Sequence, residues 1–199
     1  MTDFRTAGTI GERIQAARKM RGMNAQQLAN AVGNPSVTES IIANIETGRK
    51  GDLSVSQLLN IAYALQLSPI YLLAALGDPK RPIDLPNVSG GIEAMTSIEF
   101  DAWISIHTTG TMTWGTATED TERNQLKALR ELDHQIRERK RLAGVLALEE
   151  ETPVTPAEME ARQLWDTTEE RLIRTTMRIA QLRAYLASAG WELNVWSTE

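Results

Sequence analysis

The sequence predicts an all-α protein: a five-helix N-terminal domain, then a C-terminal domain of long helices that form a hairpin or a coiled coil. Apolar residues recur at helical spacing over residues 9–76, and caps and turn residues interrupt them at short intervals. Longer stretches with the same spacing lie between residues 119 and 189, and this half of the chain lacks strand alternation.

The composition allows one or two domains and excludes several kinds of site. The chain has 199 residues, of which 42% are hydrophobic and 24% charged, too apolar for disorder throughout. It lacks cysteine and has two histidines, His107 and His134, so disulfides, cysteine nucleophiles, thiolate zinc sites and multi-histidine metal sites are excluded. We expect neither metal nor cofactor. No apolar run approaches the ~20 residues of a membrane span, so we expect a soluble, cytoplasmic protein.

The distribution of charge does not exclude a nucleic-acid partner. The formal net charge is −5, but basic residues outnumber acidic ones over residues 1–80 and only there. The local distribution of charge decides what a surface attracts, so the acidic total does not argue against DNA binding.

Capping residues predict five short helices before residue 77. Thr9, Asn24, Thr38 and Ser54 can each accept a hydrogen bond from a first-turn N–H group, and Pro69 suits the first position of a helix. Gly33 can end the second helix. The expected helices cover residues 10–20, 25–32, 39 to about 47, 55–65 and 69–76.

Two motifs in this region resemble the helix-turn-helix of the phage lambda repressor-like (Xre/Cro) family. They are residues 23–29 (MNAQQLA) and 42–48 (IANIETG), and residues 58–65 and 68–73 fit the family's fourth and fifth helices. The resemblance spans about residues 9–76. It implies that this domain binds double-stranded DNA, with the second helix across the backbone and the third in the major groove.

The helical spacing and this resemblance together predict which side chains contact DNA. Ile42 and Ile45 should face the core, which leaves the opposite face of the third helix for base edges; Asn can bond adenine with two hydrogen bonds. The expected base contacts are Thr38, Glu39, Ser40, Ile41 and Asn44. The expected phosphate contacts are Asn24, Gln26, Arg49 and Lys50.

Several other residues of this domain have expected roles. Arg18 and Glu46 lie where family members have an internal ion pair that joins the first and third helices. Arg13, Lys19 and Arg21 are either an ordinary solvated face or further phosphate contacts. The sequence departs from the family pattern at Glu39, often Gln in the family, and in the turn over residues 33–37, which is longer than usual.

The middle of the chain predicts a linker and one short helix. Residues 80–96 are rich in proline and glycine, which indicates a linker. Thr96 begins a capping-box pattern, so we expect a helix over residues 97–106. A rival interpretation pairs residues 103–107 with 111–114 as a β-hairpin, and residues 107–118 are expected to be irregular or β-like.

Two long helices are expected at the C-terminus, over residues 119–148 and 156–189. The second has apolar residues at heptad spacing, which indicates helix packing of the coiled-coil kind, within a hairpin, between chains, or both. The expected oligomerisation residues are Trp165, Leu172, Ile179, Leu182 and Leu186. The basic cluster at residues 137–141 favours a solvated helix face over phosphate contact. The expected domains are therefore 1–79 for DNA binding, 80–96 as linker and 97–199 for oligomerisation.

These features predict a sequence-specific transcriptional regulator that binds operator DNA as a homodimer or higher oligomer. The resemblance implies a repressor of the phage or prophage type. Many such repressors carry a β-rich peptidase domain, but the C-terminal half of this chain reads as helical, so we expect no catalytic residues and no enzymatic activity. Two alternatives remain: an antitoxin or restriction-modification controller, and a protein-interaction adaptor that has lost DNA binding.

Overall fold

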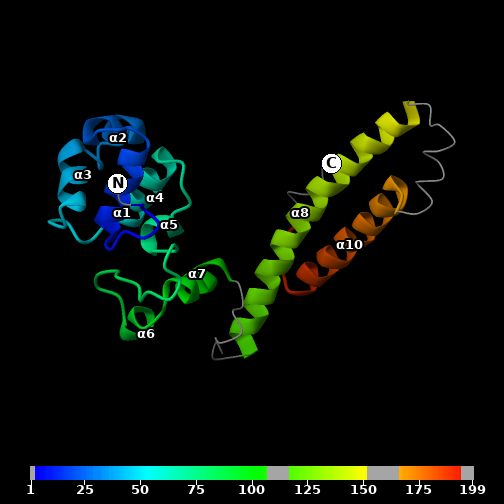
Figure 1. Cartoon of the computed structure of the whole chain (residues 1–199). Helices are drawn as coiled ribbons and strands as arrows, with labels where there is room; N and C mark the ends of the chain where they lie inside the picture. Colours follow the sequence, from blue (N-terminus) through cyan, green and yellow to red (C-terminus); the bar gives the residue numbers. More distant parts are fainter. Residues whose placement is uncertain (1–2, 107–116, 152–165, 194–199) are drawn as a thin grey trace. The chain divides into compact units, whose positions relative to one another are not determined.

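The computed structural model describes residues 3–106, 117–151 and 166–193, and the chain divides into two compact units (Figure 1). The first unit is Met1–Met112 and the second is Thr113–Glu199. Within the described ranges both units are helical, and β-pairing is limited to one isolated bridge between Pro82 and Thr96. No described helix is long and apolar enough to cross a membrane.

The expected helices of the N-terminal domain are present and begin at the expected caps. Side chains of Thr9, Asn24, Thr38 and Ser54 each accept a hydrogen bond from the third residue of the helix that follows. Three of these four are reciprocal capping boxes. The helices are α1 (Ile10–Met20), α2 (Ala25–Val32), α3 (Glu39–Glu46), α4 (Val55–Ala64) and α5 (Ile70–Leu73).

These five helices enclose one apolar core. α3 packs against α1 and α2, α2 against α4, and α1 against α5. Apolar residues from all five helices are almost fully inaccessible to solvent, which is the dominant favourable term in folding. They include Ile14, Leu28, Ile42, Ile45, Ile61, Leu65 and Leu72.

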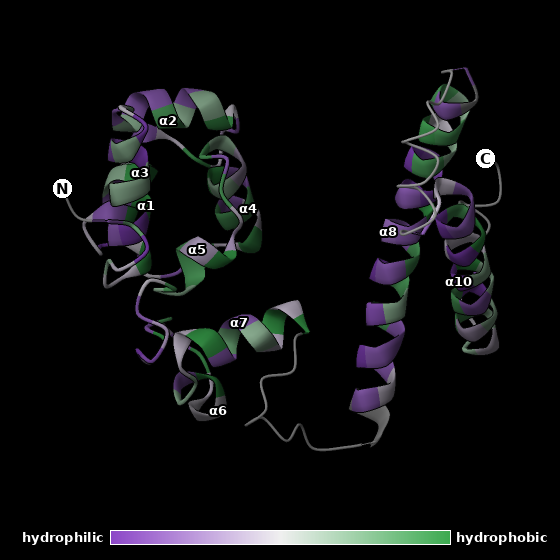
Figure 2. Ribbon diagram, turned by 45° about the vertical axis from the view of Figure 1, so that its right-hand side comes forward, coloured by the Kyte–Doolittle hydropathy of each residue, from purple (hydrophilic) through white to green (hydrophobic). Residues whose placement is uncertain are grey.

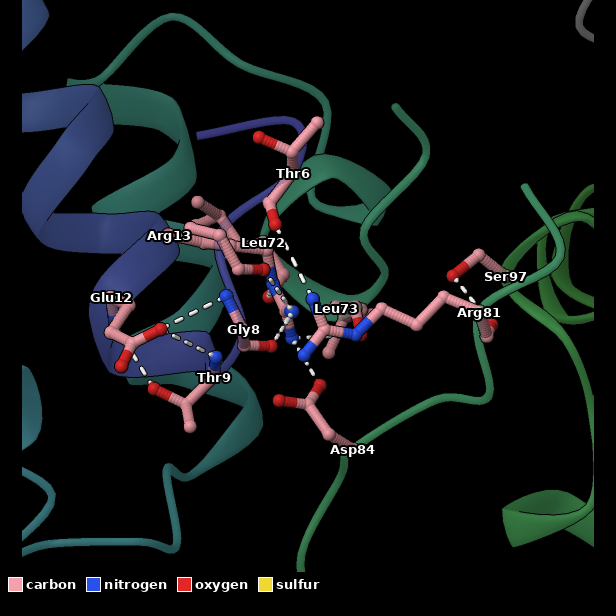
Figure 3. A network of polar contacts seen from close by, with 11 residues as sticks. Thr6, Gly8, Thr9, Glu12, Arg13, Leu72, Leu73, Arg81, Asp84 and Ser97 are labelled. Atoms are coloured by element: carbon pink, nitrogen blue, oxygen red, sulfur yellow. Dashed lines mark hydrogen bonds and ion pairs between the residues drawn. The ribbon is translucent and has the colours of Figure 1, made fainter. Parts of the chain in front are cut away.

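Helix α5 ends at Leu73 and not at residue 76 as expected, because the side chain of Arg13 donates hydrogen bonds to the carbonyl groups of its last two residues. Arg13 is fully buried and donates from Nε to the Leu72 carbonyl (2.9 Å) and from Nη2 to the Leu73 carbonyl (3.2 Å). Its Nη1 donates to the Gly8 carbonyl (2.5 Å), and Nη2 also pairs with Asp84 at 2.9 Å (Figure 3). Burial lowers the pKa of Arg13, an effect that Asp84 partly offsets.

The segment expected to be a linker is folded onto the N-terminal domain. It contains α6 (Gly90–Glu93), and the Ile83 N–H donates to the Met95 carbonyl. The Arg13–Asp84 pair also holds it, so the compact unit extends to Met112 and its boundary differs from the one expected at residue 79. The expected helix after it is present as α7 (Ser97–Ser105), so the rival strand at 103–105 is wrong; residues 107–116 lie outside the described residues.

The second unit is a hairpin of two antiparallel helices, α8 (Ala117–Glu151) and α10 (Thr168–Ser188). Thr168, at the start of α10, donates to Glu149 near the end of α8, whereas Trp191 donates to Gln125. One apolar seam joins the helices, and many other residues of both helices are hydrophilic (Figure 2). Its buried members are Ala128, Leu132, Ile179, Leu182 and Leu186.

Two expectations for this hairpin need correction. The last helix does not run unbroken from residue 156, because Asp166 and Thr167 are not helical and Thr167 caps a helix that begins at Thr168. Ile179, Leu182 and Leu186 pack on α8 of the same chain, and Leu172 is half-buried, so this seam is used within the hairpin. The expected cap near residue 156 and Trp165 lie outside the described residues.

Candidate nucleic-acid interface

Helices α2 and α3 and the turn between them form an open groove on the N-terminal unit. The groove has a volume of about 620 Å³. Most side chains around it are amides and hydroxyls, which can donate or accept hydrogen bonds without carrying charge. The lining residues are Gln26, Ala29, Asn30, Gly33, Asn34, Val37, Thr38, Glu39 and Ser40.

Helix α3 is held against α1 by a close backbone approach and by an ion pair. A Cβ atom at Gly11 would overlap the carbonyl group of Ile45, so glycine lets the two helices meet. Arg18 binds Glu46 with two hydrogen bonds of 2.6 Å and donates a third to the Met23 carbonyl. Its hydrogen bonds with Glu46 raise the pKa of Arg18 despite partial burial, so the guanidinium stays charged. The structure thus brings Arg18 and Glu46 together, as expected for the residues that orient α3.

The outer face of α3 is mostly polar and accessible. Thr38, Glu39 and Ser40 are exposed at its N-terminal end, where Thr38 also caps the helix. Asn44 is half-buried one turn further on, and its side chain makes no hydrogen bond to another described residue. Ile41 is half-buried and packs against the core, so most of its surface is not available to DNA.

The helical spacing missed two residues on this face. Ala43 and Thr47 are exposed, because α3 turns Ile41 and Ile45 toward the core. The hydroxyl of Thr47 donates to the Ala43 carbonyl at 2.8 Å. Ala43 therefore offers a methyl group of the kind that can pack on a thymine methyl.

The N-terminus of α2 presents backbone donors beside this face. The Asn24 side chain accepts from the Gln27 N–H, while Gln27 accepts from the Asn24 N–H, both at 2.8 Å. This reciprocal cap does not use the first-turn N–H groups of Ala25 and Gln26, which can therefore bind an anion such as a phosphate. The Gln26 side chain is exposed and donates to Asn30 at 2.9 Å, which adds Asn30 to the polar surface.

The long turn between α2 and α3 is ordered and forms one wall of the groove. Gly33 adopts a left-handed conformation with φ +62°, which ends α2. Asn34 accepts from the Ser36 N–H, and Gln57 of α4 donates to the Ser36 carbonyl at 2.8 Å. Val37 is buried and anchors the end of the turn. Asn30 and Asn34 are therefore groove residues that the sequence did not identify, since only the geometry of this turn brings them there.

Basic side chains follow α3 in the loop before α4. Arg49 is exposed and Lys50 half-buried, directly after the left-handed Gly48 (φ +73°).

Three other basic residues of α1 and its end were expected either on a solvated face or at phosphates. Arg13 is in neither place, because it is buried and caps the end of α5. Lys19 is exposed and donates to Gln15 within α1, and Arg21 donates to the Ala17 carbonyl. Among the described residues no group of three or more acidic or histidine side chains could hold a metal ion.

The domain has five helices, a polar outer face on α3, first-turn N–H groups of α2 that could bind an anion, and basic residues after α3. These are the parts of a helix-turn-helix DNA-binding domain. Residues 14–72 match the family model Helix-turn-helix (HTH_3). This part of the chain is therefore a helix-turn-helix domain of the lambda repressor-like (Xre) type, the domain of DNA-binding transcription regulators. Searches of curated proteins and of solved structures gave no match.

Proposed function

We propose that the protein binds operator DNA as a homodimer and represses transcription there. The N-terminal unit contacts the DNA, with Glu39, Ser40 and Asn44 at base edges and Arg49 and Lys50 at phosphates. A regulator of the phage or prophage type is the form that the family resemblance favours. Repression follows if the operator overlaps a promoter, because the bound protein then excludes the polymerase from that DNA.

The observation that carries this proposal is the polar, accessible outer face of α3 on a rigidly held helix. Ser40 is exposed on it, and Asn44 has an amide without a partner among the described residues. Direct readout needs side-chain donors and acceptors at fixed positions, and the Arg18–Glu46 ion pair supports such positioning. Phosphate contacts are expected from Arg49, Lys50 and the N–H groups at the start of α2.

Dimerisation is part of the proposal because a single small domain reads few base pairs. Two copies related by a two-fold axis would read half-sites about one helical turn apart, ~34 Å. Linking the two domains raises the effective concentration of the second once the first is bound. The second unit, which the helix-turn-helix match does not include, is available for this role.

The test is a fluorescence anisotropy titration of the full chain with labelled DNA from the region upstream of its own gene. We expect Asn44→Ala to cost about 1–3 kcal/mol of specific binding, because one side chain–base pairing is lost, and to leave binding to random DNA nearly unchanged. The matched control is Asn124→Ala, an exposed asparagine of α8. The affinity for specific DNA should also fall steeply as salt is raised.

Two outcomes would contradict the proposal. Equal losses on specific and random DNA after Asn44→Ala would reject base reading by this residue. A full chain that forms no salt-sensitive complex with DNA, but instead co-purifies with another protein, would favour the adaptor alternative.

A further inference from the structure

Helix α10 carries two apolar stripes, and the hairpin buries only one of them. The buried stripe, which includes Ile179, Leu182 and Leu186, packs on α8. The second stripe lies about a third of a turn or more away, since successive residues are ~100° apart. Its members are Ile173, Met177, Ala180, Ala184 and Ala187, and all five are exposed. We call these five residues the outer stripe.

The outer stripe has the spacing of a coiled-coil seam. Its members follow each other at alternating intervals of four and three residues over three turns and more, the pattern of heptad a and d positions. Ile173 is 49% and Met177 62% exposed, so two large apolar side chains on this face are in contact with water. The three alanines beyond them would let a second helix approach closely.

The dimer of the proposed function requires an interface, and the inference rests on that function. We propose that the outer stripe pairs with the outer stripe of a second copy of this chain, with the two α10 helices parallel. A seam used within the hairpin cannot pair between chains, whereas the outer stripe of α10 is exposed. The outer stripe lies on the side of α10 away from α8, so two hairpins joined in this way place their four helices in a row with the two α10 helices in the middle. An apolar face that water now contacts then becomes buried.

Charges beside the outer stripe favour a second copy and a parallel direction. In a parallel pair, the g position of one helix faces the e position five residues later on its partner. Glu169 is at a g position and Arg174 at the next e position; both are exposed, and Arg174 also pairs with Asp166 of its own chain at 2.8 Å. Glu169 would therefore face Arg174 of the partner subunit, and symmetry repeats this attractive contact. Gln181 and Thr176 occupy the next pair of flanking positions, so no like charges meet there.

Chain direction gives an independent reason for parallel pairing. Each N-terminal unit joins its hairpin at the N-terminal end of α8. When the two α10 helices are parallel, the two α8 helices also start at the same end of the row. Both DNA-binding domains are then tethered at one end, where they can reach the same stretch of duplex.

The absence of cysteine from the sequence makes the geometry directly testable. In a parallel pair Ala184 lies beside its own copy, within the Cα separation of about 4.4–6.8 Å that a disulfide needs. In an antiparallel pair of the full stripes Ala184 would lie near Met177 of the partner subunit instead. Mild oxidation of full-length Ala184→Cys should give a covalent dimer in high yield. Ala147→Cys, at an exposed alanine of α8, is the matched control and should stay largely monomeric on a non-reducing gel.

Sedimentation equilibrium of the glutamate variants completes the test. We expect a wild-type dimer, a dissociation constant at least 100-fold higher for Ala184→Glu, and no more than a two-fold change for Ala147→Glu. Circular dichroism should show the same helix content in all three. Charge reversal by Glu169→Arg should weaken the dimer several-fold, and Glu169→Arg with Arg174→Glu should restore it.

The results separate this inference from the proposed function. A dimer that Ala184→Glu leaves intact would overturn the outer stripe as the interface but not the dimeric regulator. A wild-type protein that stays monomeric on and off DNA would overturn both. If Ala184→Glu lowers the helix content of a monomeric protein, the stripe is covered by another part of the same chain, such as residues 152–165, and the inference is wrong. DNA binding by the N-terminal unit is measured separately, with Asn44→Ala.

Discussion

The two units of this chain differ in how many helices enclose their apolar core. In the N-terminal unit the five helices α1–α5 close around a core to which each of them contributes, and even Arg13 is buried with all its donor groups engaged. In the C-terminal unit two much longer helices share one seam, and large apolar residues such as Met177 stay exposed. The first unit also exposes large apolar residues, such as Val55 and Tyr63, so the difference lies in how many helices enclose the core and not in apolar exposure.

The sharpest way to test this comparison is to add the same methyl group to each unit. Gly11→Ala forces a Cβ atom into the carbonyl group of Ile45, so α1 and α3 must move apart. We expect a loss of about 3 kcal/mol in the stability of the N-terminal unit, the upper part of the usual range for overpacking. The loss is measured as the change in the free energy of unfolding in urea, with hydrogen exchange of the α1 amides as the probe.

Gly144→Ala is the counterpart in the C-terminal unit. A Cβ atom there meets nothing within 4 Å, and Gly144 lies inside α8. Replacing a mid-helix glycine with alanine should stabilise the hairpin by about 0.5–1 kcal/mol. If both substitutions change stability in the same direction, the contrast between a closed and an open unit is wrong.

Two ion pairs, one in each unit, provide a second contrast. The Arg18 and Glu46 side chains are 10% and 5% exposed, whereas those of Arg178 and Glu131 are 46% and 38% exposed. Glu46→Ala leaves a poorly solvated guanidinium without its partner and should cost about 3 kcal/mol. Glu131→Ala removes a solvent-screened pair and should cost less than about 1 kcal/mol. Urea midpoints of the two variants measure both values; similar losses would contradict the assigned burial.

The smallest predicted effect is an acid-dependent loss of stability in the hairpin. Hydrogen bonds from Arg178 lower the pKa of Glu131, and those from Arg141 lower the pKa of Glu138. A carboxyl whose pKa is lowered on folding stabilises the folded state above its unfolded pKa, and this contribution is lost as the pH falls through the lowered value.

The hairpin should therefore lose stability as the pH falls from about 5 toward the lowered pKa values, and less so in Glu131→Gln. Urea midpoints of α8 amides at a series of pH values measure this. Added salt should reduce the effect, because these pairs are exposed. A hairpin whose stability rises on acidification would contradict the assigned contacts.

Local signals in the sequence were sufficient for most of the fold. Caps such as Thr9 and Asn24 act within four residues of themselves, so their pattern predicts where α1 and α2 begin without knowledge of the rest of the chain. The start of α10 had an equally local signal in Thr167 and Glu170, a capping box. Because the proline at residue 156 suits the first position of a helix, the sequence predicted an earlier start.

Long-range contacts explain what the sequence could not predict. The early end of α5 depends on Arg13, which is some sixty residues away in the chain and could not be told from a surface arginine. The folding of the expected linker depends on the same side chain through Asp84. For the candidate site, the spacing predicted the exposed Glu39 and Ser40, but Ile41 packs on the core and Asn34 enters the groove through the turn geometry.

Hydrogen–deuterium exchange of the full chain, with and without DNA from its own upstream region, shows which helix enters the duplex. If that helix is α3, supported by α1 and α2, exchange on specific DNA should be slower at the start of α2 and along residues 38–44. Exchange on the exposed face of α4 should be unchanged. Protection confined to the basic residues 137–141 of α8, with α3 unaffected, would contradict this role of α3.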